Sequence, residues 1–373
     1  GTQVQRGLRR MPPSVDTDRT GTPGAEVTSP TLNATPGVVI PKSILAEVKL
    51  VLFCVFYLCA NFVLFYIPFW LYGAYHGSFA CRALLAITAL DYLVPLKPGK
   101  DGLWVWWCEL TSFARGFRSY FAAELIVEGK WKKDRNYLLM YHPHSLFGIA
   151  YTLITRYIYE VHLPGCKFLF TGADVIQYLP LLRRVMTWWG CTSVSAPAMK
   201  KNLAQPFPFN ALMLQVGGIA EMFYGIDTEQ ILLKKRMGFC KLSLQTGASL
   251  VPCYVFGANE MYTRLFGPRS MLAALSSRIQ TSLVVWYGRW GIPFGVVPHQ
   301  VKMVIALGEP IDVARVEQPT SEQIEALHAQ YVAAITTLFD KHKHRMGEEW
   351  VAARGRQLYF EDHQPGREDK KSK

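Results

Sequence analysis

A long stretch without charge constrains this chain more than any other feature. No Asp, Glu, Lys or Arg occurs between Lys49 and Arg82, and residues 50–72 are almost entirely Leu, Val, Phe, Tyr, Cys and Ile. A membrane-spanning helix needs about 20 apolar residues, and buried helices of soluble proteins seldom run this far without a charge. The run therefore predicts insertion into a membrane.

A second apolar stretch makes a transmembrane or re-entrant helical hairpin the expected arrangement of residues 42–100. Residues 83–96 are apolar and are interrupted only by Asp91. Three residues that disfavour helix separate the two stretches, namely Pro68, Gly73 and Gly77. Either form of hairpin returns the chain to its starting side, and Lys97 and Lys100 follow the second stretch. By the positive-inside tendency, both termini are expected in the cytosol.

The two ends of the chain are expected to flank the folded part. Residues 1–41 are rich in Pro, Thr, Gly and Arg without helical or strand periodicity, which predicts a disordered arm. Residues 346–373 are expected to form a tail, and its last four residues resemble the dilysine signal that returns membrane proteins to the endoplasmic reticulum. The expected location is the endoplasmic reticulum membrane or the lipid droplet surface.

Composition and charge favour a lipid-related protein. Aromatic residues make up 13% of the 373 residues, a share that is usual where rings lie at a membrane interface or line an apolar pocket. The net charge of +12 fits nucleic acid, an anionic membrane or a phosphate-bearing molecule, but the basic clusters are short and carry no nucleic-acid-binding motif. The eight cysteines include no Cys-x-x-Cys pair, so neither a zinc cage nor a thioredoxin-like site is indicated.

Residues 101–345 have the pattern of an α/β domain with a helix-flanked sheet. Five apolar segments predict buried strands, at 137–141, 168–171, 218–220, 249–256 and 301–307. Helices are expected at 181–189 and 239–244, and a last helix begins at the capping-box pattern of Thr320 and Gln323. This last helix is expected to cover the sheet.

The strongest candidates for chemistry are His142 and His144, which follow directly after the first of these strands. Loops that leave the ends of buried strands carry the reactive groups of many α/β enzymes. An imidazole, with an unperturbed pKa of about 6.5, is well suited to accept an alcohol proton. From spacing alone, the alternative that the rings only bond backbone carbonyls is equally open. A metal pair is less favoured, because no carboxylate or further His nearby completes a ligand set.

The block Tyr-His-Pro-His-Ser at 141–145 resembles the signature of the type-2 diacylglycerol acyltransferases and of their monoacylglycerol and wax-ester relatives. Other blocks agree in the same order along residues 45–345, namely Thr-Gly-Ala-Asp at 171–174, Trp-Gly-Cys at 189–191, Val-Gly-Gly-Ile-Ala-Glu at 216–221, Arg-Met-Gly-Phe at 236–239, Phe-Gly-Ala-Asn-Glu at 256–260, Gly-Arg-Trp-Gly at 288–291 and Gly-Glu-Pro-Ile at 308–311. Ser145 stands where many animal members have Gly, which suggests a plant or algal member.

The resemblance implies a mixed sheet of the glycerolipid acyltransferase type and a set of site residues. Glycerolipid acyltransferases carry an Asp five residues after the His, but Phe147 and Ile149 stand at those positions here. The resemblance therefore makes Glu221 the first candidate to hold the imidazole, with His144 as general base and His142 as a second support. The substrate-binding candidates are Pro143, Ser145, Gly217, Gly218, Lys235, Arg236 and Arg289. The basic members of this set are expected to meet the phosphates of coenzyme A or, alternatively, anionic lipid.

The expected function is the esterification of diacylglycerol to triacylglycerol, with acyl-CoA as co-substrate and no metal or redox cofactor. Direct attack of the acceptor hydroxyl on the thioester is expected, because the residues around Ser249 lack the Gly-x-Ser-x-Gly pattern of a nucleophile elbow. Monoacylglycerol and fatty alcohol are the alternative acceptors. A membrane protein that only binds neutral lipid is the non-enzymatic alternative, and a homo-oligomer is compatible with the sequence.

Overall fold

The computed structural model of the chain describes residues 26–27, 44–61, 63–96, 113–148, 163, 165–204, 210–279 and 282–361. Nearly all of the expected N-terminal arm lies outside the described residues, as do Lys97, Lys100 and the lysines at the C-terminus.

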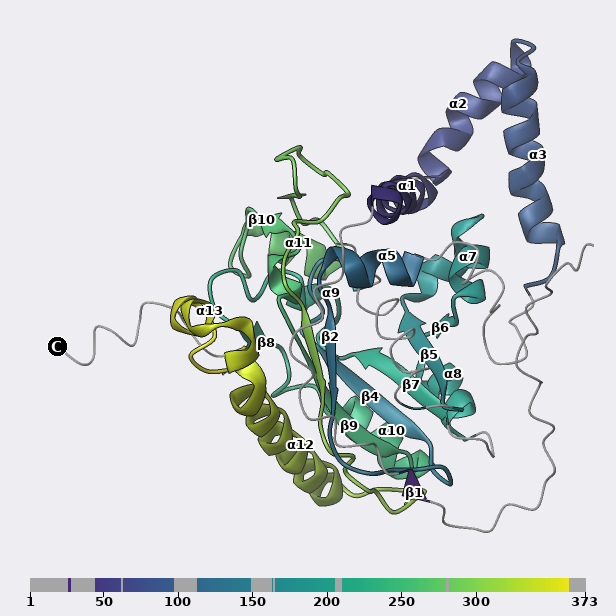
Figure 1. Ribbon diagram of the computed structural model, residues 1–373. Helices are drawn as coiled ribbons and strands as arrows, with labels where there is room; N and C mark the ends of the chain where they lie inside the picture. The colour runs from purple at the N-terminus through teal and green to yellow at the C-terminus, as the bar shows by residue number, and fades with distance from the viewer. Residues whose placement is uncertain are drawn as a thin grey trace, which may run out of the picture.

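Within the described residues, seven strands form one central sheet in the order β2-β12-β9-β4-β7-β5-β6 (Figure 1). Neighbouring strands run parallel, except that β9 and β12 run antiparallel. These strands are β2 (Glu124–Val127), β4 (Tyr137–His142), β5 (Lys167–Gly172), β6 (Cys191–Ser193), β7 (Asn210–Gln215), β9 (Ser249–Phe256) and β12 (Val304–Leu307). The expected α/β fold with a helix-flanked mixed sheet is confirmed.

Helices cover both faces of this sheet, and β4 shows how its residues divide between them. Leu139 and Tyr141 lie in a core that includes side chains of α1 (Ile44–Asn61), α5 (Phe113–Tyr120) and α7 (Leu182–Trp188). Leu138 and Met140 lie in a second core, with side chains of α8 (Ala196–Leu203), α10 (Gly238–Thr246) and α12 (Ser321–His342). Because successive residues of a strand point to opposite faces, His142 belongs to the face that α12 covers.

The long helix α12 begins as its sequence predicts. The side chain of Thr320 accepts a hydrogen bond from the N–H of Gln323, and the side chain of Gln323 accepts one from the N–H of Thr320. This reciprocal pair satisfies two of the N–H groups that a helix start leaves without partners. The buried face of α12 includes Tyr331 and Ile335, which lie in the second core with β9 side chains such as Tyr254.

One expected strand is a helix instead. The chain leaves β7 after Gln215, and Gly218–Glu221 form the short helix α9. The residues Gly-Ile-Ala do not pair with a neighbouring strand, because the place between β4 and β5 is already taken by Asn210–Gln215. The prediction of a strand at 218–220 is therefore wrong, and Glu221 does not lie at the end of a strand.

Short elements complete the described structure. The two-stranded pairs are β1 (Glu26–Val27) with β3 (Trp131–Lys132), β10 (Thr263–Arg264) with β11 (Trp286–Tyr287), and β8 (Gln230–Ile231) with β13 (Tyr359–Phe360). The remaining helices are α11 (Met271–Ile279), α13 (Glu348–Ala353) and the 3-10 turns η1 (Asp174–Tyr178), η2 (Ala258–Glu260) and η3 (Lys343–Met346).

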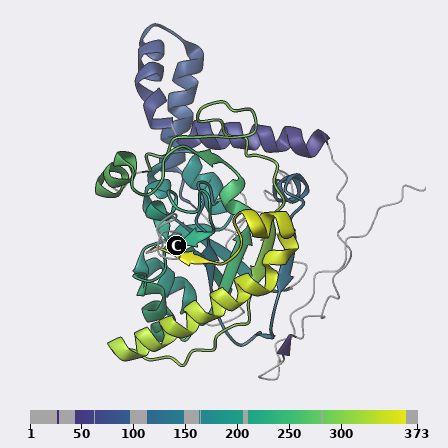
Figure 2. The same cartoon turned by 90° about the vertical axis from the view of Figure 1, so that its left-hand side faces the viewer.

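A helical hairpin projects from one end of the domain, as Figures 1 and 2 both show. Its two arms are α2 (Val63–Tyr75) and α3 (Phe79–Leu93), and the turn between them includes Gly77 with a φ of 90°. Pro68 and Gly73 lie inside α2, so the expected break at these two residues is wrong. The preceding helix α1 packs on the domain through Leu50 and Phe53.

The hairpin was expected to cross the membrane or to re-enter it. In the part of the chain that the structure describes, no helix combines the length and the apolar character that a membrane crossing requires.

An acidic residue on the hairpin fastens it to the domain. Asp91 is 4% exposed, and its carboxylate accepts hydrogen bonds from Arg183 over 2.8 Å and from Arg184 over 2.6 Å. It also accepts the main-chain N–H of Leu181 at 3.1 Å. The last turn of α3 is therefore fixed to the start of α7 by a buried carboxylate that accepts from three donors.

Candidate active site

Three loops meet at one edge of the sheet, and they carry the residues singled out by the sequence. Strands β4, β7 and β9 are parallel, with Tyr141 beside Gln215 on one side and beside Cys253 on the other. The carboxyl ends of parallel strands lie at the same edge, which is where open α/β sheets bind ligands. The loops that follow these strands bring His144, Glu221 and Ala258 together at this edge.

The ring of His144 is held by the next residue. Nδ1 of His144 lies 2.9 Å from the carbonyl oxygen of Ser145. A carbonyl oxygen only accepts, so Nδ1 carries the proton and the lone pair of the neutral ring is on Nε2. Burial lowers the pKa of His144, against hydrogen bonds with backbone groups that raise it. At neutral pH the ring is therefore a neutral base.

Ser145 shapes this loop rather than facing outward. Its backbone adopts a φ of 54°, in the left-handed region that glycine enters at no steric cost. Its Oγ donates a hydrogen bond of 2.6 Å to the carbonyl oxygen of Ala258, and the side chain is buried. Ser145 thereby ties the loop after β4 to the loop after β9.

Glu221 is buried and holds the same loop from the other side. It is 1% exposed, so its carboxyl group is shielded from solvent. Its Oε2 accepts the main-chain N–H of His144 over 2.7 Å, and its Oε1 accepts the main-chain N–H of Leu232 over 2.8 Å. Burial raises the pKa of Glu221 to about 7, although these two N–H groups and Arg236 lower it. The expected contact with the imidazole is replaced by a contact with the main chain.

The two glycines before Glu221 have different roles. A Cβ at Gly217 would lie 2.3 Å from the carboxyl carbon of Glu221, so only glycine leaves room for the side chain in this position. Gly218 has a φ of 59°, and a Cβ there would meet nothing within 4 Å. The glycine pair therefore makes space for Glu221 and turns the chain into α9.

His142 lies under α12, away from the loop. It is fully buried, and its Nε2 is 3.1 Å from the hydroxyl of Tyr331. Burial lowers its pKa to about 3, so the ring is neutral. A cis peptide bond joins it to Pro143, which is buried. The structure thus separates the two histidines: His142 lies on the face of the second core, and His144 lies in the partly exposed loop.

The basic residues assigned to coenzyme A lie on an exposed turn. Lys235 and Arg236 are exposed, and Nη2 of Arg236 is 3.3 Å from the carbonyl oxygen of Gly217. The main-chain N–H groups of residues 233–235 donate to the carboxylate of Glu361. These backbone donors are therefore occupied by a group of the protein itself.

Arg289 lies some distance along the chain, in the turn after β11. Its guanidinium is 3.7 Å from the carboxylate of Glu47 and stands over the ring of Tyr120 at 5.7 Å. These contacts connect the turn to α1 and α5.

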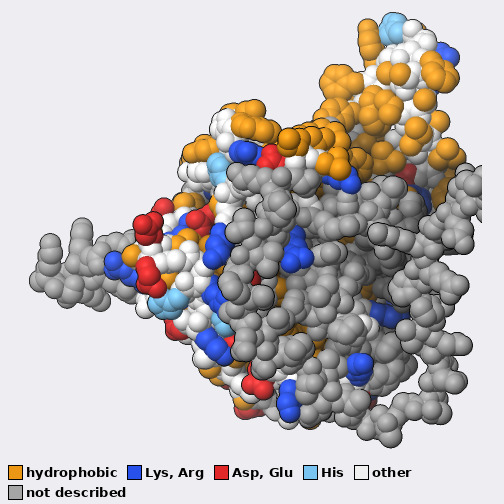
Figure 3. Space-filling model, in the orientation of Figure 1, with side chains coloured by type: hydrophobic (Ala, Val, Ile, Leu, Met, Phe, Trp, Pro, Cys, Tyr) orange, Lys and Arg blue, Asp and Glu red, His pale blue; other side chains and the backbone are white. Residues whose placement is uncertain are grey.

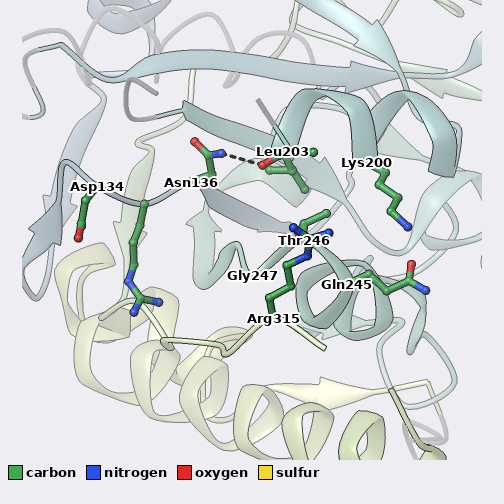
Figure 4. A pocket seen from close by; sticks show the side chains of 10 residues that line it. Asp134, Asn136, Lys200, Leu203, Gln245, Thr246, Gly247 and Arg315 are labelled. Atoms are coloured by element: carbon green, nitrogen blue, oxygen red, sulfur yellow. Dashed lines mark hydrogen bonds between the residues drawn. The ribbon is translucent and has the colours of Figure 1, made fainter. Parts of the chain in front are cut away.

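A polar pocket with a volume of about 240 Å³ opens near the amino-terminal end of β4 (Figure 4). Its lining includes Asn136, which precedes β4, whereas His144 follows β4. The remaining lining residues are Asp134, Arg135, Lys200, Leu203, Ala204, Gln245, Thr246, Gly247 and Arg315. The pocket and the histidine loop are thus at opposite ends of the same strand.

Among the described residues, no group of three or more His, Cys, Asp or Glu side chains is arranged to hold a metal ion.

The sequence analysis did not identify Tyr331 as the partner of His142. The alternation of side chains along β4 and the buried face of α12 together place the two residues opposite each other. The sequence analysis also missed the carbonyl oxygens of Ser145 and Ala258, because main-chain contacts leave no sequence signal.

Known proteins resemble this chain over most of its length. The model of the diacylglycerol acyltransferase family matches residues 79–352. Diacylglycerol O-acyltransferase 2 of Dictyostelium discoideum is 35% identical over 244 residues, which cover 61% of this chain and 72% of that protein. The protein of the same name from Bos taurus is 33% identical over 283 residues, which cover 71% of this chain and 76% of that protein. The expected plant or algal origin stays a prediction.

A solved structure is matched more weakly. The crystal structure of the 1-acyl-sn-glycerophosphate acyltransferase PlsC from Thermotoga maritima is 13% identical, with a TM-score of 0.38, and covers 79% of this chain and 97% of that chain. The family match and the likeness to the Bos taurus protein, over more than two thirds of both chains, are sufficient on their own: this chain is an enzyme of the diacylglycerol acyltransferase family.

Proposed function

We propose that this enzyme transfers the acyl group of acyl-CoA to the free hydroxyl of diacylglycerol, which gives triacylglycerol and coenzyme A, with His144 as the general base. The observation that carries the proposal is the arrangement of His144: its Nδ1 faces the carbonyl oxygen of Ser145, and Glu221 holds its loop at the carboxyl ends of the parallel strands β4, β7 and β9. Diacylglycerol is the acceptor in the names of the related proteins, and this supports it as the acceptor here.

The base step follows from the tautomer of His144. A thioester is already activated, so the enzyme mainly has to deprotonate a weakly acidic hydroxyl as it attacks. Nε2 carries the lone pair of the neutral ring, and it accepts the hydroxyl proton while the hydroxyl oxygen bonds to the thioester carbon. The proton on Nδ1 stays in place, because the carbonyl oxygen of Ser145 stabilises the charged ring through this hydrogen bond.

The second half of the reaction returns the proton. The C–S bond breaks as the carbonyl re-forms, and the sulfur of coenzyme A leaves as a thiolate. The imidazolium of His144 is the acid that protonates this thiolate, and the ring regains its neutral state. Burial disfavours the charged ring, so the return of the proton is favourable.

Direct transfer is supported by the environment of the nucleophiles that a covalent route would use. Ser249 is fully buried in β9, and its Oγ donates to Asp312 over 2.9 Å. Burial raises the pKa of Cys253 well above its ordinary value and that of Cys191 to about 12, which disfavours their reactive thiolates. A covalent route would instead need a nucleophile beside an activating base, as a histidine activates a catalytic serine.

We further propose that the exposed apolar side chains of the hairpin, on α2 and α3, contact a lipid surface. In Figure 3, apolar side chains gather on α2 and α3 and along the neighbouring upper rim of the domain. Phe65 is 71% exposed and Phe69 is 73% exposed, and exposed apolar side chains recur along both arms, as they do on surfaces that bind a membrane or a partner. The other exposed apolar residues of this hairpin include Leu64, Leu71, Tyr72, Tyr75, Phe79, Ile87, Leu90 and Leu93. The bilayer of the endoplasmic reticulum or the surface of a lipid droplet would cover this face.

The proposal also assigns phosphate groups to three basic residues, namely Lys235, Arg236 and Arg289. Lys235 and Arg236 are exposed on the turn that adjoins Glu221 through Leu232 and Gly217. They would meet the phosphates of coenzyme A while the thioester lies near His144. Arg289, which contacts α1 through Glu47, is better placed for lipid phosphate at the membrane surface.

A competition experiment tests the acceptor and the route together. Purified enzyme receives one labelled acyl-CoA with equal amounts of diacylglycerol, monoacylglycerol and fatty alcohol, and the labelled products are separated. We expect triacylglycerol to dominate, and wax ester or diacylglycerol as the main product would assign a different acceptor. A parallel sample without acceptor should leave no stoichiometric label on the protein. Label that is chased into triacylglycerol would contradict direct transfer.

A further inference from the structure

Four consecutive main-chain N–H groups are divided between two carboxylates. The N–H of Leu232 donates to Glu221 over 2.8 Å. The N–H groups of Leu233, Lys234 and Lys235 donate to the carboxylate of Glu361, over 2.8, 3.1 and 3.0 Å. The donor that fixes Glu221 is thus the first of a row whose other three members are fixed by the C-terminal segment.

The C-terminal segment 354–361 reaches this row as a strap across the loop after α9. Its strand β13 runs parallel to β8, and the N–H of Tyr359 donates to the carbonyl oxygen of Glu229 over 2.8 Å. The side-chain amide of Gln230 donates to the carbonyl oxygen of Phe360 over 2.8 Å. The strap is therefore paired with residues 229–231 immediately before the row of donors begins.

A buried ion pair fixes the start of the strap. Nε of Arg354 donates to Glu229 over 2.7 Å, and Nη2 of Arg354 donates to the carbonyl oxygen of Gly225 over 2.9 Å. Glu229 is fully buried and also accepts from Tyr254 over 2.6 Å and from Asn259 over 3.1 Å. Moving the strap away would leave the buried charge of Glu229 without its cation, so these contacts favour the observed pairing of the two segments.

We propose that residues 354–361 position Glu221, and that Glu361 is the positioning residue that holds the Leu232 N–H in line with the Glu221 carboxylate. The inference rests on the proposed function, since it concerns the residue that holds the loop of His144. The strap lies beyond residues 79–352, the part of the chain that the family model matches.

The charge of Glu361 gives its positioning role a measurable effect on the pKa of Glu221, which packing alone would not produce. The negative charge of Glu361 raises the pKa of Glu221, in addition to the larger effect of burial. Replacing Glu361 by Gln keeps one acceptor oxygen, which is enough for the two N–H groups that share Oε2, and removes this charge. The pH at which Glu221 ionises should then fall while the loop stays in place.

Three variants of the full-length enzyme test the strap. Glu361→Ala removes the acceptor for three N–H groups, and we expect kcat to fall about 10- to 100-fold, as a misplacement of about 1 Å in a site can do. Glu361→Gln should keep more of kcat and should shift the acid limb of the rate profile to lower pH. Gln357→Ala changes an exposed residue of the same strap and serves as the matched control. Thermal unfolding of each variant reports on global stability.

Amide hydrogen exchange at residues 232–235 separates the strap from the proposed function. In Glu361→Ala these amides should exchange faster, with the exchange of β4 and β9 unchanged. Wild-type kcat in Glu361→Ala, or lost activity with unchanged exchange at 232–235, would overturn the positioning role. Wild-type kcat in Glu221→Gln would instead remove Glu221 from the proposed function, and the exchange result would still report on the strap by itself.

Discussion

Oε2 of Glu221 accepts the main-chain N–H of His144 at 2.7 Å, so the carboxylate fixes the backbone that carries the imidazole. The ring itself is oriented by the carbonyl oxygen of Ser145. This division of labour differs from a catalytic triad, in which a carboxylate bonds the ring and stabilises its charge directly. Loss of Glu221 should therefore misplace the base rather than change its tautomer.

The pH dependence of kcat/KM should reflect the ionisation of Glu221. Only the carboxylate accepts from both N–H groups at full strength, so kcat/KM should rise with pH through about 7, the pKa to which burial raises Glu221. Glu221→Gln should lower kcat and remove this limb. The limb that remains should lie below pH 6.5, because burial lowers the pKa of His144 from 6.5. A limb near 7 that persists in Glu221→Gln would assign it to another group.

Gly217→Ala should disturb the site without touching the substrate. The new Cβ would lie 2.3 Å from the carboxyl carbon of Glu221, so the side chain must leave its position and give up the N–H of His144. We expect kcat to fall about 10-fold or more. Gly238→Ala is the control, because a Cβ at Gly238 meets nothing within 4 Å. Equal rates for both variants would contradict the role of Gly217 as space for the carboxylate.

Asp91→Ala should loosen the hairpin from the domain. The substitution leaves Arg183 and Arg184 without their buried carboxylate, and breaking a buried pair in this way costs about 3 kcal/mol. Asp340→Ala removes the pair with Lys343, in which the carboxylate is half exposed, and should cost less than about 1 kcal/mol. Chemical unfolding of both variants in detergent measures the two costs. A loss for Asp91→Ala no larger than that of the control would show that the contact does not fasten the hairpin.

The hairpin should be responsible for much of the affinity for lipid. Replacing Phe65 and Phe69 by Glu places two charges on a face that we expect to be covered by apolar chains, at a cost of about 2 kcal/mol or more for each. Flotation with liposomes should recover much less of the double variant than of the wild type. The control carries Glu at two exposed positions of α12, Gln330 and Thr337. Full flotation of the hairpin variant would contradict a lipid contact through this face.

The sequence predicted the elements whose patterns are local. The apolar runs of β4 and β9 and the capping box of Thr320 and Gln323 were found because burial and helix starts act through neighbouring residues. The helix at 218–221 was missed, since Gly-Ile-Ala is too short to show a period. The partner of a buried group is a long-range matter, and neither the contact of His142 with Tyr331 nor that of Glu361 with residues 233–235 leaves a local pattern.

The most direct measurement is the turnover of purified His144→Ala with acyl-CoA and diacylglycerol. Loss of a general base should lower kcat about 10²- to 10⁴-fold, with thermal unfolding and lipid binding unchanged. His344→Ala, which changes an exposed histidine of η3, should keep the wild-type rate. A near-normal rate of triacylglycerol formation in His144→Ala would contradict the account and would remove His144 from the base role.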